Sequence, residues 1–407
     1  MAPMHWHSGM ALLHGILGKR PPVTRGKIDF MMHRRWPSVA LLVCLLQCAY
    51  PGAASQTAKA RRNSVAEFQV GSTFRKFTPQ DKAYNWRGAQ THALAATVWY
   101  PAAASAVERE VEIPGLSDIF ELGRAAQDAD LASAPAKFPM VVISHGTGGS
   151  ALTMSWLGHG LAAHGYIAVA VNHPGNNGAE AYTAQGFSTW WERARDLSVV
   201  IDSMLADPMF GKRIDSSRIG AAGFSLGGYT MIEIAGGITD TDAFRQFCAS
   251  PRADGICKSP PEFPKLADDF ERLSTSDAEF QAALRHSGDS YRDRRVRAVF
   301  AMAPALGPAF HTASLAKIAI PVMIVAGEAD ANVPIASSAK YFAANIRGAK
   351  LKIFPGNAAH YMFLESCTES GRKMRPLLCT DGAGVDRDEI HAKTVGLAVE
   401  FFGATLR

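Results

Sequence analysis

The chain has 407 residues, of which 47% are hydrophobic and 19% are charged. This composition is typical of a soluble globular enzyme and argues against a disordered or a membrane protein, and the length suffices for one large domain or two ordinary ones. The net charge is +5, but the six lysines and arginines of the first 54 residues, set against Asp29 alone, account for all of it. The balanced remainder gives no indication of binding to nucleic acid or to an anionic surface.

Residues 1–54 have the pattern of a leader that ends in an export signal. A basic cluster at residues 33–35 precedes an apolar run at 39–46, and small residues follow at 52–54. The apolar run is too short to span a bilayer, so an integral membrane anchor is the weaker interpretation. We expect a signal peptide over residues 31–54, cleavage near Ala54, and a secreted or periplasmic protein.

The next segment predicts two strands and then a surface excursion. Residues 68–77 and 92–100 alternate enough to form a pair of strands near the start of the mature chain. Residues 102–137 are rich in alanine and contain a Pro-Gly turn after Ile113. They predict an excursion on the surface with one short helix.

From residue 140 onward, short apolar runs alternate with helix-like segments. This rhythm predicts a mostly parallel sheet flanked by helices, which is an α/β fold, with the functional groups in loops at the carboxyl ends of the strands. The predicted strands are residues 140–143, 166–171, 218–222, 296–302, 322–326 and 351–354, and the predicted helices are 156–164, 190–205, 229–235 and 386–402.

One interval, about residues 239–295, is too long for a simple connection. It contains prolines, two cysteines and an amphipathic stretch at 268–286. We expect a cap inserted over the site, and a peripheral decoration is the alternative. The domain prediction is therefore a single domain over residues 55–407 with this insertion.

The motif that carries the chemistry is Gly223-Phe224-Ser225-Leu226-Gly227. It follows a short apolar run and precedes a helix-like segment, as a nucleophile elbow requires. Glycine two residues before and after the serine leaves room for the strand and the helix to approach each other. The alternative is an ordinary glycine-rich turn with a bystander serine.

A serine nucleophile needs a base, and the base needs an acid that orients it. Asp330 follows the predicted strand that ends at residue 326, and His360 follows the one that ends at residue 354. Both come after Ser225 in the chain order expected for this kind of elbow. Glu328 is a weaker candidate for the acid, and His391 competes as the base but falls within a predicted helix.

An oxyanion requires N–H donors that are already oriented. We expect one from the backbone of Leu226 and the second from the loop at residues 145–149, where Thr147 is the predicted donor. An ordinary or phosphate-binding glycine turn is the alternative for this loop, but it lacks the lysine of a P-loop.

Four cysteines remain beyond the leader, and they allow three pairings. The short loops favour Cys248–Cys257 and Cys367–Cys379, each worth about 3 kcal/mol by loop closure in an oxidising compartment. No CxxC or His/Cys cluster indicates zinc, and we expect no cofactor and no metal.

These motifs together resemble an α/β-hydrolase with an inserted cap. Trp99-Tyr100-Pro101, Asn172-His-Pro-Gly175, Arg195-Asp-Leu197 and the cysteine-bearing tail narrow the resemblance to secreted predicted dienelactone hydrolases and relatives of platelet-activating-factor acetylhydrolases, over roughly residues 65–403. The resemblance implies a carboxylic-ester hydrolase with Ser225 as nucleophile, Asp330 as acid and His360 as base. Authentic dienelactone hydrolases use a cysteine where this chain has Ser225.

The leading hypothesis is a secreted serine esterase that forms an acyl-enzyme with small esters of short to medium acyl chains. Lipase or phospholipid acetylhydrolase activity, or peptidase or acyltransferase activity on the same triad, is the enzymatic alternative. A catalytically silent binding protein on a hydrolase scaffold is the alternative from another class, against which the complete set of Ser, Asp and His argues. The oligomeric state stays open.

Overall fold

The computed structural model describes residues 68–407 of the chain. The predicted leader, its cleavage site near Ala54 and the start of the mature chain lie outside the described residues. Within residues 68–407, no helix is both long and apolar enough to cross a membrane.

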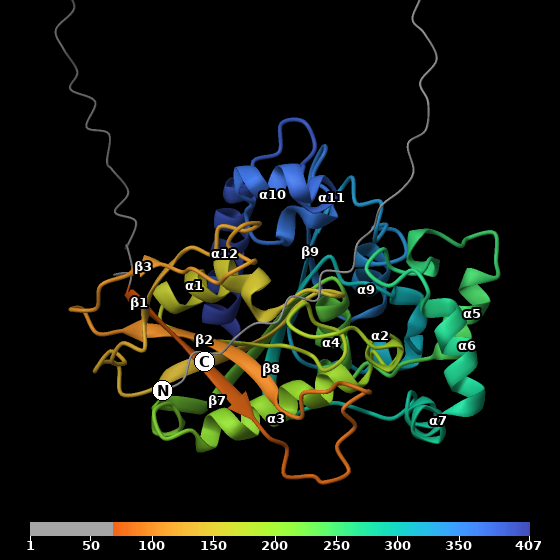
Figure 1. The fold of residues 1–407 in the computed structure, drawn as a ribbon, viewed down its shortest axis with the longest axis horizontal. Coiled ribbons are helices and arrows are strands. Elements are labelled where there is room, and N and C mark those ends of the chain that lie inside the picture. Colours follow the sequence, from red (N-terminus) through yellow and green to blue (C-terminus); the bar gives the residue numbers. More distant parts are fainter. Residues whose placement is uncertain (1–67) are drawn as a thin grey trace, which may run out of the picture. The chain divides into compact units, whose positions relative to one another are not determined.

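A ten-stranded sheet runs through the described part of the chain (Figure 1), in the order β10-β9-β8-β7-β5-β6-β2-β1-β4-β3. The six strands from β10 to β6 are parallel, and β2 joins them antiparallel through β6. The strands are β1 Gln69–Phe77, β2 Leu94–Ala102, β3 Arg109–Glu110, β4 Arg124–Gln127, β5 Phe138–Ser144, β6 Ile167–Val171, β7 Ile214–Phe224, β8 Val296–Met302, β9 Val322–Gly327 and β10 Lys350–Phe354. The predicted α/β fold with a mostly parallel sheet is confirmed.

Helices cover both faces of this sheet. Successive residues of β5 point to opposite faces, so that Val142 joins the apolar core under α3 and α4 while Val141 joins the core under α1 and α12. Burial on both sides explains why the central strands are almost uninterrupted apolar runs. The helices are α1 Ser155–Ala163, α2 Ala184–Ser188, α3 Glu192–Ala206, α4 Leu226–Ala235, α5 Thr241–Cys248, α6 Leu266–Ser276, α7 Ala278–Arg285, α8 Thr312–Leu315, α9 Ala339–Asn345, α10 Glu369–Met374, α11 Pro376–Cys379 and α12 Arg387–Thr405.

The excursion between β2 and β5 differs from its prediction. It contains the short strands β3 and β4 instead of a helix. β4 pairs in parallel with β1, through Gly71 and Ala126, and so extends the sheet at its edge. Alanine-rich composition predicts helix, but pairing with an already formed edge strand prevails here over local propensity.

The amphipathic stretch at 268–286 forms two helices, α6 and α7. The break lies at Asp277, whose side chain accepts a hydrogen bond from the backbone N–H of Phe280 and thereby caps α7. Figure 1 shows α5, α6 and α7 together at one side of the described domain. Leu273 of α6 and Phe280 of α7 pack on Ala184 of α2, which attaches this interval to the domain.

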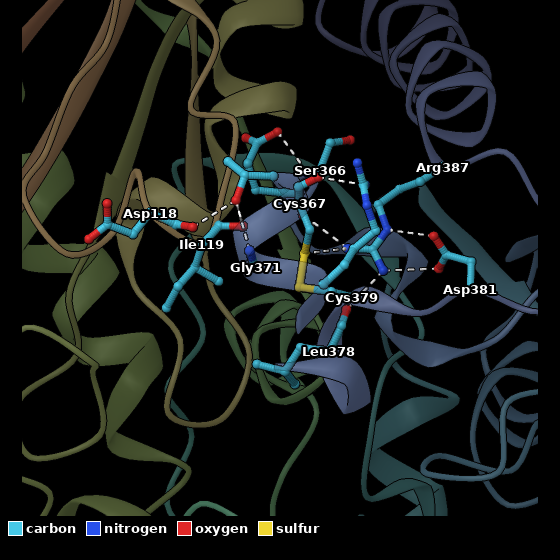
Figure 2. The surroundings of a disulfide bond; sticks show 12 residues. Asp118, Ile119, Ser366, Cys367, Gly371, Leu378, Cys379, Asp381 and Arg387 are labelled. Atoms are coloured by element: carbon cyan, nitrogen blue, oxygen red, sulfur yellow. Dashed lines mark hydrogen bonds and ion pairs between the residues drawn. A yellow bond between two sulfur atoms is a disulfide. The ribbon is translucent and has the colours of Figure 1, made fainter. Parts of the chain in front are cut away.

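Two disulfides tie down the longer connections. They join Cys248 to Cys257 and Cys367 to Cys379, the pairing that loop length favours. Figure 2 shows the second of them beside Arg387, which donates to the carbonyl oxygen of Leu378 and pairs with Asp381. These contacts fix the segment that directly follows the short 3-10 helix at His360–Phe363.

Candidate active site

Ser225 stands on a sharp turn between β7 and α4. Its φ of 56° and ψ of −115° are strained for a residue with a side chain. A Cβ at Gly223 would lie 2.3 Å from the carbonyl oxygen of Gly227, and one at Gly227 would lie 1.9 Å from that of Ser144. The N–H of Ser225 donates to the carbonyl oxygen of Met302 at 2.8 Å. Only glycine fits two positions before and two positions after the serine, which explains the spacing of the motif.

Ser225, His360 and Asp330 form a continuous series of hydrogen bonds. Nε2 of His360 lies 2.9 Å from Oγ of Ser225, and Nδ1 lies 2.7 Å from Oδ2 of Asp330. Because a carboxylate only accepts, Nδ1 carries the proton and Nε2 is left to accept from the serine hydroxyl. This tautomer is the one in which the imidazole can act as a base toward Ser225.

The strands explain how residues so distant in sequence meet. Ser225 follows β7, Asp330 follows β9 and His360 follows β10, and these strands are parallel. Their carboxyl ends therefore lie at one edge of the sheet. Asp330 is held in place by the backbone N–H of Val333, which donates to its Oδ1 at 2.7 Å.

The competing residues are occupied elsewhere. His391 lies in α12, stacks on Trp156 with ring centroids 4.1 Å apart, and contacts the carbonyl oxygen of Met362 through Nε2 at 3.0 Å. Burial, followed by the charge of Arg387, lowers the pKa of His391 to about 4. Glu328 accepts from the backbone N–H of Gly356 and braces the turn after β10.

The loop at residues 145–149, which follows β5, presents backbone N–H groups near Ser225. A Cβ at Gly146 would lie 3.3 Å from Cβ of Ser225, so this loop touches the elbow. The carbonyl oxygen of Gly146 faces Nδ1 of His145 at 2.6 Å and the N–H of Gly149 at 3.3 Å. In a trans peptide the following N–H, that of Thr147, points the opposite way. Within residues 68–407 neither this N–H nor that of Leu226 donates to a backbone carbonyl of a turn or loop.

A second Ser–His–Asp series lies beneath this loop and was not predicted from the sequence. Oγ of Ser144 is 2.8 Å from Nε2 of His173, and Nδ1 of His173 is 2.7 Å from Oδ2 of Asp196. All three side chains are fully buried, so Ser144 cannot reach a substrate. Burial, followed by the charges of Arg193 and Arg87, holds the pKa of His173 well below its ordinary value.

This buried series is part of a network that supports the loop at residues 145–149. Asp196 also accepts from the hydroxyl of Tyr84, and both of its carboxylate oxygens accept from Nη2 of Arg87 at 2.8 Å. Arg193 donates to the carbonyl oxygen of His145. The sequence points to His173 and Asp196 only through the family resemblance. Their hydrogen-bond partners could not be predicted, because this network joins four separate segments of the chain.

The interval predicted as a cap borders the candidate site. A Cβ at Gly255 would lie 2.7 Å from the carbonyl oxygen of Ala331, the residue next to Asp330. Asp254 accepts from the hydroxyl of Ser337 at 2.5 Å, further along the same loop. In the part of the chain that the structure describes, no group of three or more His, Cys, Asp or Glu residues could hold a metal ion.

A parallel sheet covered on both faces, with a serine at a strand–helix elbow and a histidine and aspartate from later strand ends, defines an α/β hydrolase. The chain belongs to the alpha/beta hydrolase family, whose model matches residues 141–369.

Sequence relatives cover small parts of the chain. It is 31% identical over 97 residues to cutinase est1 of Thermobifida alba, which is 23% of this chain and 29% of that protein. Over 83 residues it is 30% identical to lipase 1 of Moraxella sp. (strain TA144), which is 20% of this chain and 23% of that protein. The chain thus spans less than a third of the length of these curated relatives.

A solved structure covers far more. Ferulic acid esterase from Streptomyces cinnamoneus matches with a TM-score of 0.55 at 20% identity, over 86% of this chain and 92% of that one. At this identity the likeness establishes the fold, and the reaction must be argued from the site.

Proposed function

We propose that this protein is a serine carboxylic-ester hydrolase in which Ser225 is the nucleophile, His360 the base and Asp330 the orienting acid. The observation that carries the proposal is the position of His360, which contacts Oγ of Ser225 with one ring nitrogen and Asp330 with the other. Family membership and the partial similarity to a cutinase and a lipase support hydrolysis of esters.

The proposed reaction proceeds through an acyl-enzyme. His360 accepts the hydroxyl proton as Ser225 Oγ attacks the ester carbonyl carbon, and Asp330 stabilises the resulting imidazolium. The N–H groups of Leu226 and Thr147 receive the oxyanion. His360 then gives the proton to the departing alkoxide, and water releases the acyl group by the same steps in reverse roles.

We expect small esters of short to medium acyl chains to be the preferred substrates. The cap interval has no broad apolar face that would open onto lipid, because Phe280 is 1% exposed and Phe263 packs on Phe187. Of Phe263, Phe270 and Phe280, only Phe270 is exposed, at 38%, and its ring packs edge-on against Phe280. We also propose that the protein is related to secreted dienelactone hydrolases and platelet-activating-factor acetylhydrolases. We propose further that it is exported, which the leader sequence and the two disulfides support.

The test is labelling with a fluorophosphonate together with turnover of p-nitrophenyl esters of increasing acyl length. The wild type is expected to be labelled at Ser225. It should hydrolyse esters with acyl chains from acetyl up to octanoyl faster than palmitoyl esters. Ser225→Ala should lose both labelling and turnover while the fold is retained. A label that peptide mapping places on Ser144 would refute the choice of nucleophile. Interfacial activation on palmitoyl esters would refute the expected substrate class.

A further inference from the structure

The cap interval carries a carboxylate, Glu262, on a stiff loop between the Cys248–Cys257 disulfide and α6. The loop reads Pro260-Pro261-Glu262-Phe263-Pro264, and the N–H of Phe263 closes a turn onto the carbonyl oxygen of Pro260 at 3.0 Å. The three prolines restrict the backbone. The ring of Phe263 packs on Phe187 with centroids 5.2 Å apart. The position of Glu262 is therefore fixed by the fold.

Glu262 lies against the loop that carries the proposed oxyanion donor. A Cβ at Gly148 would come within 3.0 Å of Cγ of Glu262 and equally close to the hydroxyl of Tyr182. Gly148 directly follows Thr147, and Tyr182 donates to the Gly148 carbonyl oxygen at 2.8 Å. Glu262 thus lies beside the loop that is proposed to receive the ester carbonyl oxygen.

The same carboxylate is within electrostatic reach of the proposed base. Burial raises the pKa of Glu262, while a hydrogen bond from its own backbone N–H and then the charge of a protonated His360 act in the opposite direction. After burial, Glu262 is also the largest influence that raises the pKa of Tyr361, to about 12. These influences agree with the contact at Gly148, which places Glu262 beside Tyr182.

No cation among residues 68–407 pairs with this carboxylate. In this part of the chain neither a lysine nor an arginine contributes to the electrostatics of Glu262. A partly buried carboxylate without a cation is costly, and a ligand cation would offset that cost. Aromatic faces such as those of Tyr182 and Tyr361 also attract cations.

We propose that Glu262 is a specificity-determining residue that selects esters by charge, favouring substrates with a positively charged group near the scissile bond over neutral ones and disfavouring anionic ones. This inference rests on the proposed ester hydrolysis at Ser225 and concerns which esters that site accepts.

The experiment compares three meta-substituted phenyl acetates of similar shape, which carry a trimethylammonium, a tert-butyl or a carboxylate group. At about pH 8, where a carboxylate is ionised, kcat/KM for the cationic ester should exceed that for the anionic ester by about tenfold or more, mainly through KM. Glu262→Gln should reduce this ratio to within about threefold. The ratio cancels any common loss of active enzyme.

Glu271→Gln is the matched control, since Glu271 is an exposed carboxylate on α6 of the same interval. It should leave the ratio unchanged, and added salt should lower the ratio in the wild type. Equal ratios in the wild type and Glu262→Gln would overturn the inference alone. Absence of turnover of all three esters by the wild type, with no labelling of Ser225, would overturn the proposed function and this inference with it.

Discussion

Replacing Asp196 by asparagine would remove the negative charge at the centre of the network beneath the loop at residues 145–149. Asp196 is fully buried and accepts hydrogen bonds from Tyr84, Arg87 and His173. Asparagine has nearly the same shape, but its amide group would point a donor at groups that are themselves donors. The substitution would therefore leave the Arg87 guanidinium, 1% exposed, without a counter-charge.

The magnitude follows from that burial. Breaking a buried ion pair by removing one partner costs about 3–5 kcal/mol, because a charge remains uncompensated away from water. The entropy of unfolding is about 2.1 cal/mol/K per residue, or roughly 0.7 kcal/mol/K for residues 68–407. The unfolding midpoint should accordingly fall by about 4–7 °C.

Urea unfolding followed by tryptophan fluorescence, with a thermal scan of the same samples, measures the effect. Glu110→Gln is the control, because Glu110 pairs with Arg124 at a similar distance, 2.8 Å, but both side chains are more than half exposed. That variant should change the free energy of unfolding by about 0.5 kcal/mol or less. A loss below about 1 kcal/mol in Asp196→Asn would refute the reasoning, since it would mean that Arg87 finds another partner or water.

Three further predictions concern single groups. His360→Ala should lower kcat by about 10⁴-fold while His391→Ala stays near the wild type, as steady-state kinetics can measure; an inactive His391→Ala would refute the choice of base. The buried carboxyl of Glu233 has a pKa of about 8 because of burial, so the folded state holds this proton more tightly than the unfolded state. Wild-type stability should therefore fall relative to Glu233→Gln by about 1.4 kcal/mol per pH unit between roughly pH 5 and 8, and parallel pH curves would contradict this. Replacing Cys367 and Cys379 by alanine should lower the free energy of unfolding by about 3 kcal/mol, and an unchanged urea midpoint would count against a structural role for that disulfide.

The central fold could be predicted because its signals are local. The central parallel strands are buried on both faces and so appear as apolar runs, as Ile167–Val171 does in β6. The two glycines of the elbow could also be predicted from the sequence, since only a residue without a side chain fits the contacts at Gly223 and Gly227. From chain order alone, Asp330 and His360 could be proposed as partners of Ser225.

Contacts between distant segments could not be predicted in this way. The alanine-rich excursion has a helical composition, yet β4 pairs with β1 because an edge strand was available to it. Asp196 reads locally as one more polar residue of a helix, and its burial becomes apparent only when Tyr84, Arg87 and His173 surround it.

The amino-acid sequence by itself determined the order of the six parallel strands, the serine turn and the identity of the groups that follow the strand ends. The tertiary structure alone decided that Nε2 of His360 faces Ser225, that Ser144 is sealed beneath the loop, and that Glu262 lies beside the site. The physical reason is that backbone propensity and hydrophobic periodicity act over a few neighbouring residues, whereas burial and charge pairing depend on which distant segments pack together.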